Sequence, residues 1–134
     1  MATANSATRT AVNYVIGLPH DEVETMPIKR MMIDDKYTDV LCSYGEHFPL
    51  LVKMPDGGVF LNDNDFFGPA YRVAWAESSF GLNSRHNRPR PKVSQATARH
   101  CRGAQSALEL LGYQTTGIRR QFAEYLLVEF RKPA

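Results

Sequence analysis

The residues with the clearest chemical character in this sequence are basic side chains in its second half. Between residues 85 and 120 the chain carries seven Arg and one Lys against one acidic residue, Glu109. The eight are Arg85, Arg88, Arg90, Lys92, Arg99, Arg102, Arg119 and Arg120. A guanidinium group is a planar fork of donors that fits phosphate or carboxylate through paired hydrogen bonds, whereas an ammonium group is a point charge. This choice of residue favours a surface that contacts phosphate groups.

Two shorter groups of these residues suggest how such a surface would engage nucleic acid. Gln95, Arg99 and Arg102 fall on one face of an expected helix, and Gln and Arg are side chains that read adenine and guanine in a major groove. The loop before that helix carries a basic arm that would clamp the backbone or enter a minor groove. The arm consists of His86, Arg88, Arg90 and Lys92. The chain before the helix does not read as the first half of a helix-turn-helix pair, so phosphate contacts would outweigh base contacts.

The net charge of +2 hides a strong division along the chain. Residues 1–80 hold 6 Lys or Arg and 11 Asp or Glu, a balance of −5, whereas residues 81–134 hold 10 and 3, a balance of +7. Exposed ion pairs contribute only about 0–1 kcal/mol each, so pairing with the acidic half would not explain why so many arginines cluster. Nucleic acid, DNA above all, is therefore the expected partner. The alternative is an ordinary solvated basic face.

Metal and thiol chemistry fit the spacing poorly. A zinc site built from Cys42, His47, His86 and Cys101 would lack the short paired ligands of structural zinc. Cys101 follows His100 directly, and adjacent helical residues point about 100° apart, so this histidine is badly placed as a base for that thiol. We expect two buried thiols that are not joined in a disulfide.

Other catalytic and ligand motifs are also missing from the sequence. The run Asn62-Asp63-Asn64-Asp65 resembles a calcium loop, but counting from Asp63 the required twelfth-position Glu is Ala74. No phosphate-binding loop, dinucleotide motif, nucleophile elbow or zinc-protease motif occurs. The prediction is a protein that is not an enzyme and needs no metal or cofactor.

Composition fits one globular domain spanning residues 1–134. The chain is 43% hydrophobic and 22% charged, which is typical of such domains. No stretch approaches the roughly 20 apolar residues of a membrane span. The first residues lack the pattern of a secretory signal, so we expect a cytoplasmic protein.

The residue pattern predicts an α+β fold. A small antiparallel meander is expected across residues 38–62, where polar and apolar residues alternate and the segment from Pro55 to Gly58 forms a tight turn. One main helix is expected over residues 93–111, with Ser94 as its N-cap and Gly112 in a left-handed C-cap. Its many small residues indicate that another element packs closely against it.

The remaining segments are less regular. Residues 1–11 are small and polar and are predicted to be a frayed N-terminus. Residues 20–36 are predicted to be mostly irregular, with the segment from Met31 to Ile33 anchored in the core. The patterns of residues 71–80, which contain Trp75, and of residues 122–130 each allow either a strand or a helix, and we favour a terminal strand over 122–130.

Four short motifs carry a resemblance. They are the segment SYGEHFP from Ser43 to Pro49, the turn at Gly57-Gly58, Asn62, and Thr97-Ala98-Arg99-His100. In this order they resemble a family of small bacteriophage proteins of unknown function. This chain lacks the family's usual Thr before the Pro and has a long insertion before Thr97. The resemblance implies a phage protein acting in the cytoplasm of a bacterial host, and it supplies no catalytic residues.

The sequence thus predicts a small, non-enzymatic binding or regulatory protein that contacts nucleic acid through its Arg-rich face. The alternative is a protein-interaction module that binds and modulates a bacterial host protein. Self-association into a homo-oligomer, through an exposed strand edge, is also open.

Overall fold

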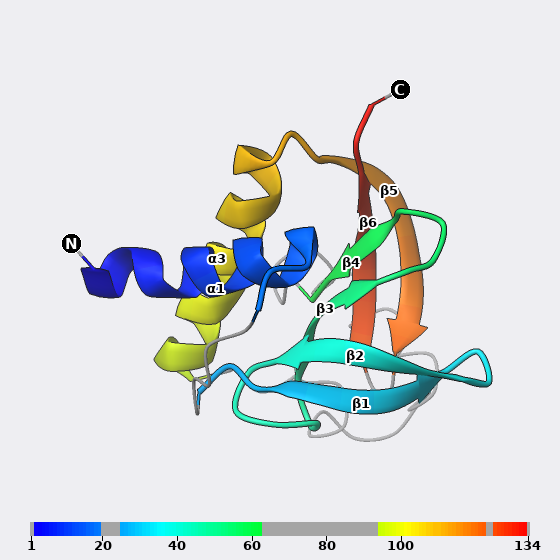
Figure 1. Cartoon of the computed structure of the whole chain (residues 1–134), viewed down its shortest axis with the longest axis horizontal. Helices are drawn as coiled ribbons and strands as arrows, with labels where there is room; N and C mark the ends of the chain where they lie inside the picture. Colours follow the sequence, from blue (N-terminus) through cyan, green and yellow to red (C-terminus); the bar gives the residue numbers. More distant parts are fainter. Residues whose placement is uncertain (1, 20–24, 63–93, 123–124, 134) are drawn as a thin grey trace, which may run out of the picture.

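A computed structural model describes residues 2–19, 25–62, 94–122 and 125–133 of the chain. Its elements are α1 (Ala2–Ile16), β1 (Ile28–Ile33), β2 (Lys36–Cys42), β3 (Pro49–Lys53), β4 (Val59–Leu61), α3 (Gln95–Leu110), β5 (Gln114–Phe122) and β6 (Tyr125–Arg131). The strands form a six-stranded sheet in the order β1-β2-β3-β4-β6-β5, with antiparallel neighbours throughout. Both helices lie on the same side of this sheet (Figure 1). The predicted α+β fold is confirmed.

The predicted meander forms the centre of the sheet. β2, β3 and β4 pair in sequence order, and the tight turn between β3 and β4 lies at the predicted place. Gly57 has a φ of +96°, which glycine adopts without a Cβ clash. The Asp56 carboxylate accepts a hydrogen bond of 3.0 Å from the Gly58 amide, and this bond closes the turn.

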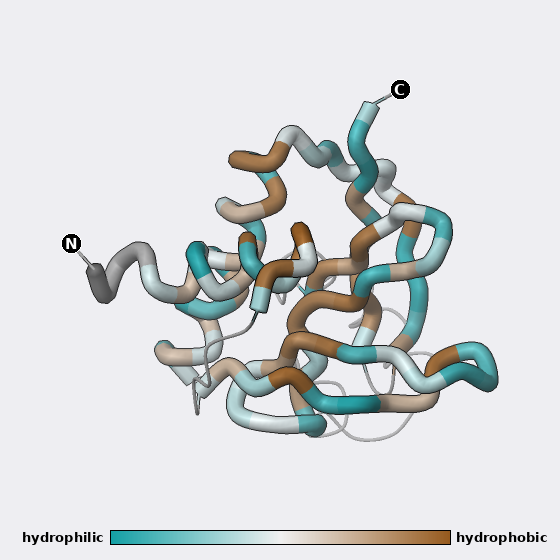
Figure 2. Tube along the Cα trace, viewed as in Figure 1, coloured by the Kyte–Doolittle hydropathy of each residue, from teal (hydrophilic) through white to brown (hydrophobic). Residues whose placement is uncertain are grey.

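Both faces of the central strands are buried. Successive residues of a strand point to opposite faces, and neighbours such as Val40 and Leu41 accordingly belong to two different apolar clusters. The cluster on the helix side also contains side chains from α1 and α3. Hydrophobic residues concentrate in these strands, whereas the helices carry both kinds of residue and β5 is mostly hydrophilic (Figure 2).

The main helix also forms as predicted. Ser94 is the N-cap of α3, and its hydroxyl accepts a 3.1 Å hydrogen bond from the Thr97 amide. Gly112 follows the helix with a φ of +86°, as a left-handed cap requires. The apolar stripe of α3, which includes Ala104, Ala107 and Leu108, is fully buried against the sheet.

The frayed N-terminus predicted for residues 1–11 is wrong over residues 2–11, because these belong to α1. The segment has no Gly or Pro before Gly17, and α3 provides the close packing that a helix of small side chains needs. A Cβ built on Gly103 of α3 would lie 2.7 Å from the Ala7 Cβ, so the two helices touch at this glycine. The other end of α1 is fixed by Tyr14, whose hydroxyl donates to the Asp39 carbonyl at 2.6 Å and accepts from the Lys53 amide at 3.1 Å.

Two strands differ from the sequence prediction. Part of the segment 20–36 that was predicted to be irregular forms β1, which pairs with β2 as an edge strand. Met31 and Ile33 pack on the core as expected, but Met32 points the other way and is 55% exposed. β5, which the residue pattern does not predict, is the opposite edge strand and pairs with β6.

The predicted terminal strand is confirmed as β6. Residues 71–80, including Trp75, lie outside the described residues. Within the part of the chain that the structure describes, no helix is long and apolar enough to cross a membrane.

Candidate functional site

A groove between α1 and α3 is lined by polar side chains from both helices. Its volume is about 640 Å³. Residues 6–10 of α1 and 96–106 of α3 contribute to its lining, together with the segments around Thr25 and Tyr44. The lining residues are Ser6, Ala7, Thr8, Thr10, Thr25, Met26, Tyr44, Ala96, Arg99, His100, Arg102, Gly103 and Ser106. Among these residues are two arginines and several hydroxyl groups, but no carboxylate.

The structure brings two of the predicted basic residues together in this groove. Arg99 and Arg102 lie one helical turn apart on α3, and both are exposed. Neither forms an ion pair with any carboxylate among the residues described. Gln95, which was predicted to share this face, is exposed but is not part of the groove lining. The basic arm (Arg85, His86, Arg88, Arg90 and Lys92) lies outside the described residues.

Arg119 and Arg120 do not share a surface with each other. They occupy β5, where Arg119 pairs with Val128 and Arg120 with Leu127. Val128 belongs to the cluster on the helix side and Leu127 to the cluster on the other face, so the two arginines point to opposite faces of the sheet.

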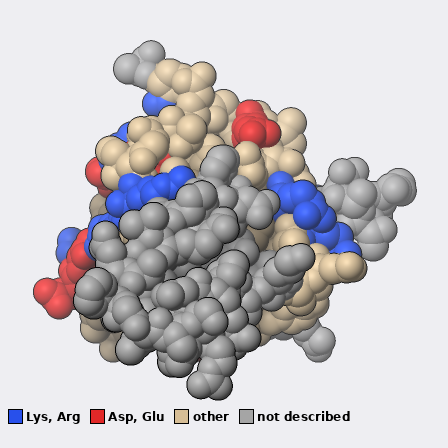
Figure 3. All heavy atoms as spheres, turned by 180° about the vertical axis from the view of Figure 1, so that it is seen from behind, with Lys and Arg blue, Asp and Glu red and all other residues tan. Residues whose placement is uncertain are grey.

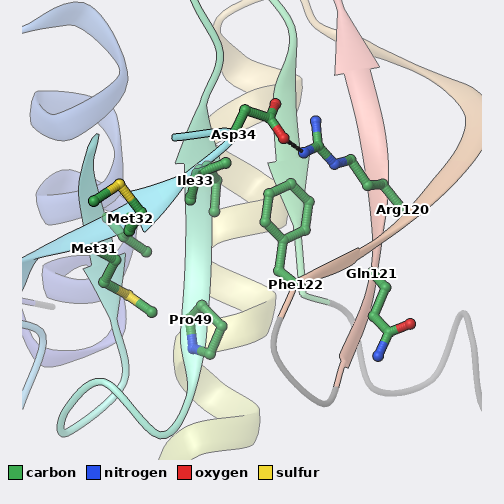
Figure 4. A pocket seen from close by; sticks show the side chains of 10 residues that line it. Met31, Met32, Ile33, Asp34, Pro49, Arg120, Gln121 and Phe122 are labelled. Carbon is green, nitrogen blue, oxygen red and sulfur yellow. Dashed lines mark hydrogen bonds and ion pairs between the residues drawn. The ribbon is translucent and has the colours of Figure 1, made fainter. Parts of the chain in front are cut away.

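Arg120 already has an acidic partner within the molecule. Its guanidinium forms an ion pair with Asp34 beside a smaller pocket that Met31 and Phe122 also line (Figure 4). On the face shown in Figure 3, basic side chains form separate groups at the two sides of the view, and acidic side chains lie next to the left-hand group. Arg119 and Arg120 therefore do not lie together on one face of the sheet.

A buried hydrogen-bond network lies next to the groove and includes His100, one of its lining residues. The Ser43 hydroxyl lies 2.8 Å from His100 Nδ1 and 3.0 Å from Thr97 Oγ1. Thr97 is bonded in turn to the N-cap hydroxyl of Ser94 at 3.2 Å. The network thus connects the loop after β2 to the first turns of α3, and it fixes the orientation of the His100 ring.

The imidazole of His100 is kept neutral by its surroundings. Burial lowers the pKa of His100, and the nearby positive charge of Arg99 lowers it further. The ring is 9% exposed and faces the groove. Tyr44 lies beside it, with the two ring centroids 5.4 Å apart and the planes tilted by 34°.

The residues of the four resembling motifs supply most of the buried polar groups. The buried polar side chains among the described residues are Ser43, Asn62, Thr97, His100 and Glu129. Asn62 donates to the Pro49 carbonyl at 2.8 Å, so it holds the start of β3 next to the end of β4. Its Oδ1 atom is buried without a hydrogen-bond partner. These residues hold the loop after β2 in place, and Tyr44 is part of that loop.

The geometry does not favour nucleophilic or metal chemistry at these groups. Ser43 is fully buried, so a substrate could not reach its hydroxyl despite the hydrogen bond to His100. Cys42 and Cys101 are both buried thiols, as predicted, and burial raises the pKa of Cys42 to about 11, which disfavours the reactive thiolate. No cluster of potential metal ligands occurs within the described ranges.

Sequence reasoning missed Ser43, Tyr44 and His100 as parts of a possible site. The contact between Ser43 and His100 joins residues that are 57 positions apart, and no local pattern encodes it. The only signal was the set of resembling motifs, which contained all three residues. Comparison with protein-family models, with curated proteins and with solved structures finds no match for this chain.

Proposed function

We propose that the protein binds nucleic acid, without altering it chemically, through the groove between α1 and α3. The observation that carries this proposal is the pair of exposed arginines, Arg99 and Arg102, in a hollow that no described carboxylate lines. A guanidinium without an internal acidic partner is available to a phosphate, and it binds that group through two charge-assisted hydrogen bonds.

The other lining residues suit a phosphate backbone as well. Hydroxyl groups of Ser, Thr and Tyr are common partners of phosphate oxygens, and this groove carries them on both helices, at Thr10 and Ser106 among others. The charge of the second half of the chain, +7 over residues 81–134, would attract a polyanion from a distance. The basic arm over residues 85–92, if it contacts the same ligand, adds further phosphate contacts.

Salt dependence tests the proposal directly. Each phosphate that the protein neutralises releases counterions, so the logarithm of the binding constant should fall linearly with the logarithm of the salt concentration. In a fluorescence-anisotropy titration, the double variant R99A/R102A should bind more weakly at low salt. Its slope should be shallower by roughly 1.4–1.8, the share of two phosphate contacts.

A matched control removes the same charge outside the groove. Arg120 and Arg131 are both paired with carboxylates, at Asp34 and at Asp56 and Glu129 respectively. The variant R120A/R131A should therefore keep the wild-type slope. Equal slopes for wild type and R99A/R102A, or no binding by the wild type at low salt, would contradict the proposal.

The proposal places the protein in the cytoplasm of a bacterial host, in line with the phage resemblance and the two buried thiols.

A protein partner is the competing possibility. A pull-down from bacterial lysate, with and without nuclease treatment, separates the two. A host protein that is retained after nuclease digestion would favour a protein-interaction module.

A further inference from the structure

We propose that the α1–α3 groove takes single-stranded rather than duplex nucleic acid, with one base stacked on Tyr44 and the neighbouring phosphates held by Arg99 and Arg102. This inference rests on the proposed nucleic-acid binding and names the form of the ligand. Three features of the groove carry this inference: its shape, the backbone conformation of Tyr44, and the contact between the Tyr44 and His100 rings.

The shape of the groove argues against a duplex. A helix that reads a major groove must project from the protein, because that groove is about 12 Å wide and admits one helix. Here α1 lies directly against α3, and the contact between Ala7 and Gly103 adjoins Arg102. α1 thus forms a wall beside the arginines. A hollow of about 640 Å³ is in the range of pockets that hold a single small ligand, so it suits individual nucleotides.

Tyr44 has an unusual backbone conformation at the end of this groove. Its φ is +66°, in the left-handed region that a bulky side chain rarely adopts. Glycine adopts this region readily, but the glycine here is the next residue, Gly45. Hydrogen bonds hold the loop in this state: the Tyr44 amide donates to the Thr25 carbonyl at 2.8 Å, and the Ser43 amide donates to the Phe48 carbonyl at 3.0 Å. Backbone strain of this kind clusters at functional sites. Its effect here is that the Tyr44 side chain lines the groove while 47% of the residue stays exposed.

The Tyr44 ring packs against a second aromatic ring of the groove. The His100 ring lies 5.4 Å away, and the hydrogen bond between Ser43 and His100 Nδ1 fixes that ring. A base of any identity can stack on an exposed aromatic ring whose position is fixed by its neighbours. Arg99 precedes His100 on α3 and lines the same groove as Tyr44. A nucleotide stacked on Tyr44 therefore has a cation beside it for its phosphate.

The test compares three ligands of equal length on the full chain: a labelled thymidine oligonucleotide, a uridine oligonucleotide and a DNA duplex. Fluorescence anisotropy at one low salt concentration gives the three dissociation constants. We expect the single strands to bind more tightly than the duplex. The ratio between thymidine and uridine strands assigns the ligand to DNA or to RNA within the same class.

Variants at Tyr44 then examine the stack. Y44A should weaken single-strand binding by roughly 5- to 100-fold, the range that loss of one base stack produces. Y44F keeps the ring and should bind within about twofold of the wild type, a difference well below the loss of one stack. Y37A is the matched control, because Tyr37 is 64% exposed on β2 and is not part of the groove lining. It should leave binding unchanged.

Ultraviolet cross-linking of the wild type, followed by mass spectrometry of the peptides, does not depend on how well a variant folds. A cross-linked nucleotide on Tyr44 would support the inference, and cross-links confined to other segments would overturn it. Tighter binding of the duplex, or wild-type affinity in a folded Y44A, would also overturn it while leaving nucleic-acid binding intact. Failure to bind any of the three ligands at low salt would instead remove the proposed function itself.

Discussion

The network around His100 is the most consequential arrangement at the scale of single residues. Ser43 has one hydroxyl hydrogen but two partners, Thr97 Oγ1 and His100 Nδ1. If Ser43 donates to Thr97, His100 must carry its proton on Nδ1, and Nε2 is then an acceptor. If Ser43 donates to His100, the proton lies on Nε2. The second arrangement needs a neutral ring, since a protonated imidazole has no acceptor, whereas the first can also form with a protonated ring.

The surroundings of His100 predict a pH dependence of stability. The folded-state pKa of His100 is lowered from its ordinary value of 6.5 by burial and by Arg99. Below pH 6.5 the unfolded chain therefore binds a proton that the folded protein does not bind. The free energy of unfolding should fall as the pH drops from about 7 through the unfolded pKa, and level off below the folded pKa. Urea denaturation at a series of pH values measures this.

The variant H100N identifies the residue responsible. Asparagine keeps a polar group near the position of Nδ1 but does not titrate, so the loss of stability between about pH 7 and 5.5 should be smaller in H100N than in the wild type. The test compares the change of unfolding free energy with pH, so the absolute stability of H100N matters less. A wild-type slope that persists unchanged in H100N would show that other groups cause it.

The chemical types of the site residues were easier to predict than their positions. Arg99 and Arg102 were correctly expected on one helical face, because a three-residue spacing fixes that relation within the helix. Arg119 was expected to join them, but its place on an edge strand depends on how β5 pairs. The left-handed backbone of Tyr44 has no signature in the residue types either, since Gly45 is the residue that would favour it.

At the scale of elements, the contact between α1 and α3 decides the shape of the groove. The two helices approach each other most closely where α3 has Gly103 and α1 has Ala7. Small residues at a helix crossing let the backbones come together, and the space that opens on either side of such a crossing is a natural groove. Gly103 is therefore tied to the binding surface without touching a ligand.

Replacing this glycine tests the close packing. G103A would gain roughly 1 kcal/mol of helix propensity, but its Cβ would lie 2.7 Å from the Ala7 Cβ and 3.0 Å from the Thr8 backbone nitrogen. Because backbone atoms cannot move aside cheaply, we expect a net loss of about 1–3 kcal/mol in unfolding free energy, as in other overpacked cores. The variant A7G removes the shortest of the three close contacts, so G103A should cost less when it is made in A7G than when it is made in the wild type. A G103A protein more stable than the wild type would contradict this packing.

The elements that could be predicted are those with strong internal patterns. β2, β3 and α3 have clear periodicity, and the turn at Gly57 and the cap at Ser94 mark their ends. α1 is rich in Ala, Thr and Ser, and its stability comes from tertiary contacts at Gly103 and at the sheet, which composition does not reveal. β5 carries mostly polar residues because it is an exposed edge strand, so the alternation that identifies a half-buried strand is weak there.

At the scale of the whole molecule, the fold and the proposed binding depend on different residues. The described core has apolar clusters on both faces of the sheet, and this burial is insensitive to ionic strength at ordinary salt concentrations. The ion pairs among the described residues are few and partly exposed, at Arg120 and Arg131. The groove arginines Arg99 and Arg102 belong to neither group. Their charge is therefore available for a ligand and contributes little to the fold.

This separation predicts that salt affects binding and stability very differently. Between about 50 and 200 mM salt, a protein with several phosphate contacts loses orders of magnitude in affinity. Over the same range the free energy of unfolding should change by no more than about 1 kcal/mol, because screening weakens only a few surface pairs worth about 0–1 kcal/mol each. Urea denaturation without ligand at each salt concentration, run beside the anisotropy titrations, gives both numbers on the same protein. If stability fell in parallel with affinity, the loss of binding would reflect unfolding, and the arginines would have to be counted among the groups that hold the fold together.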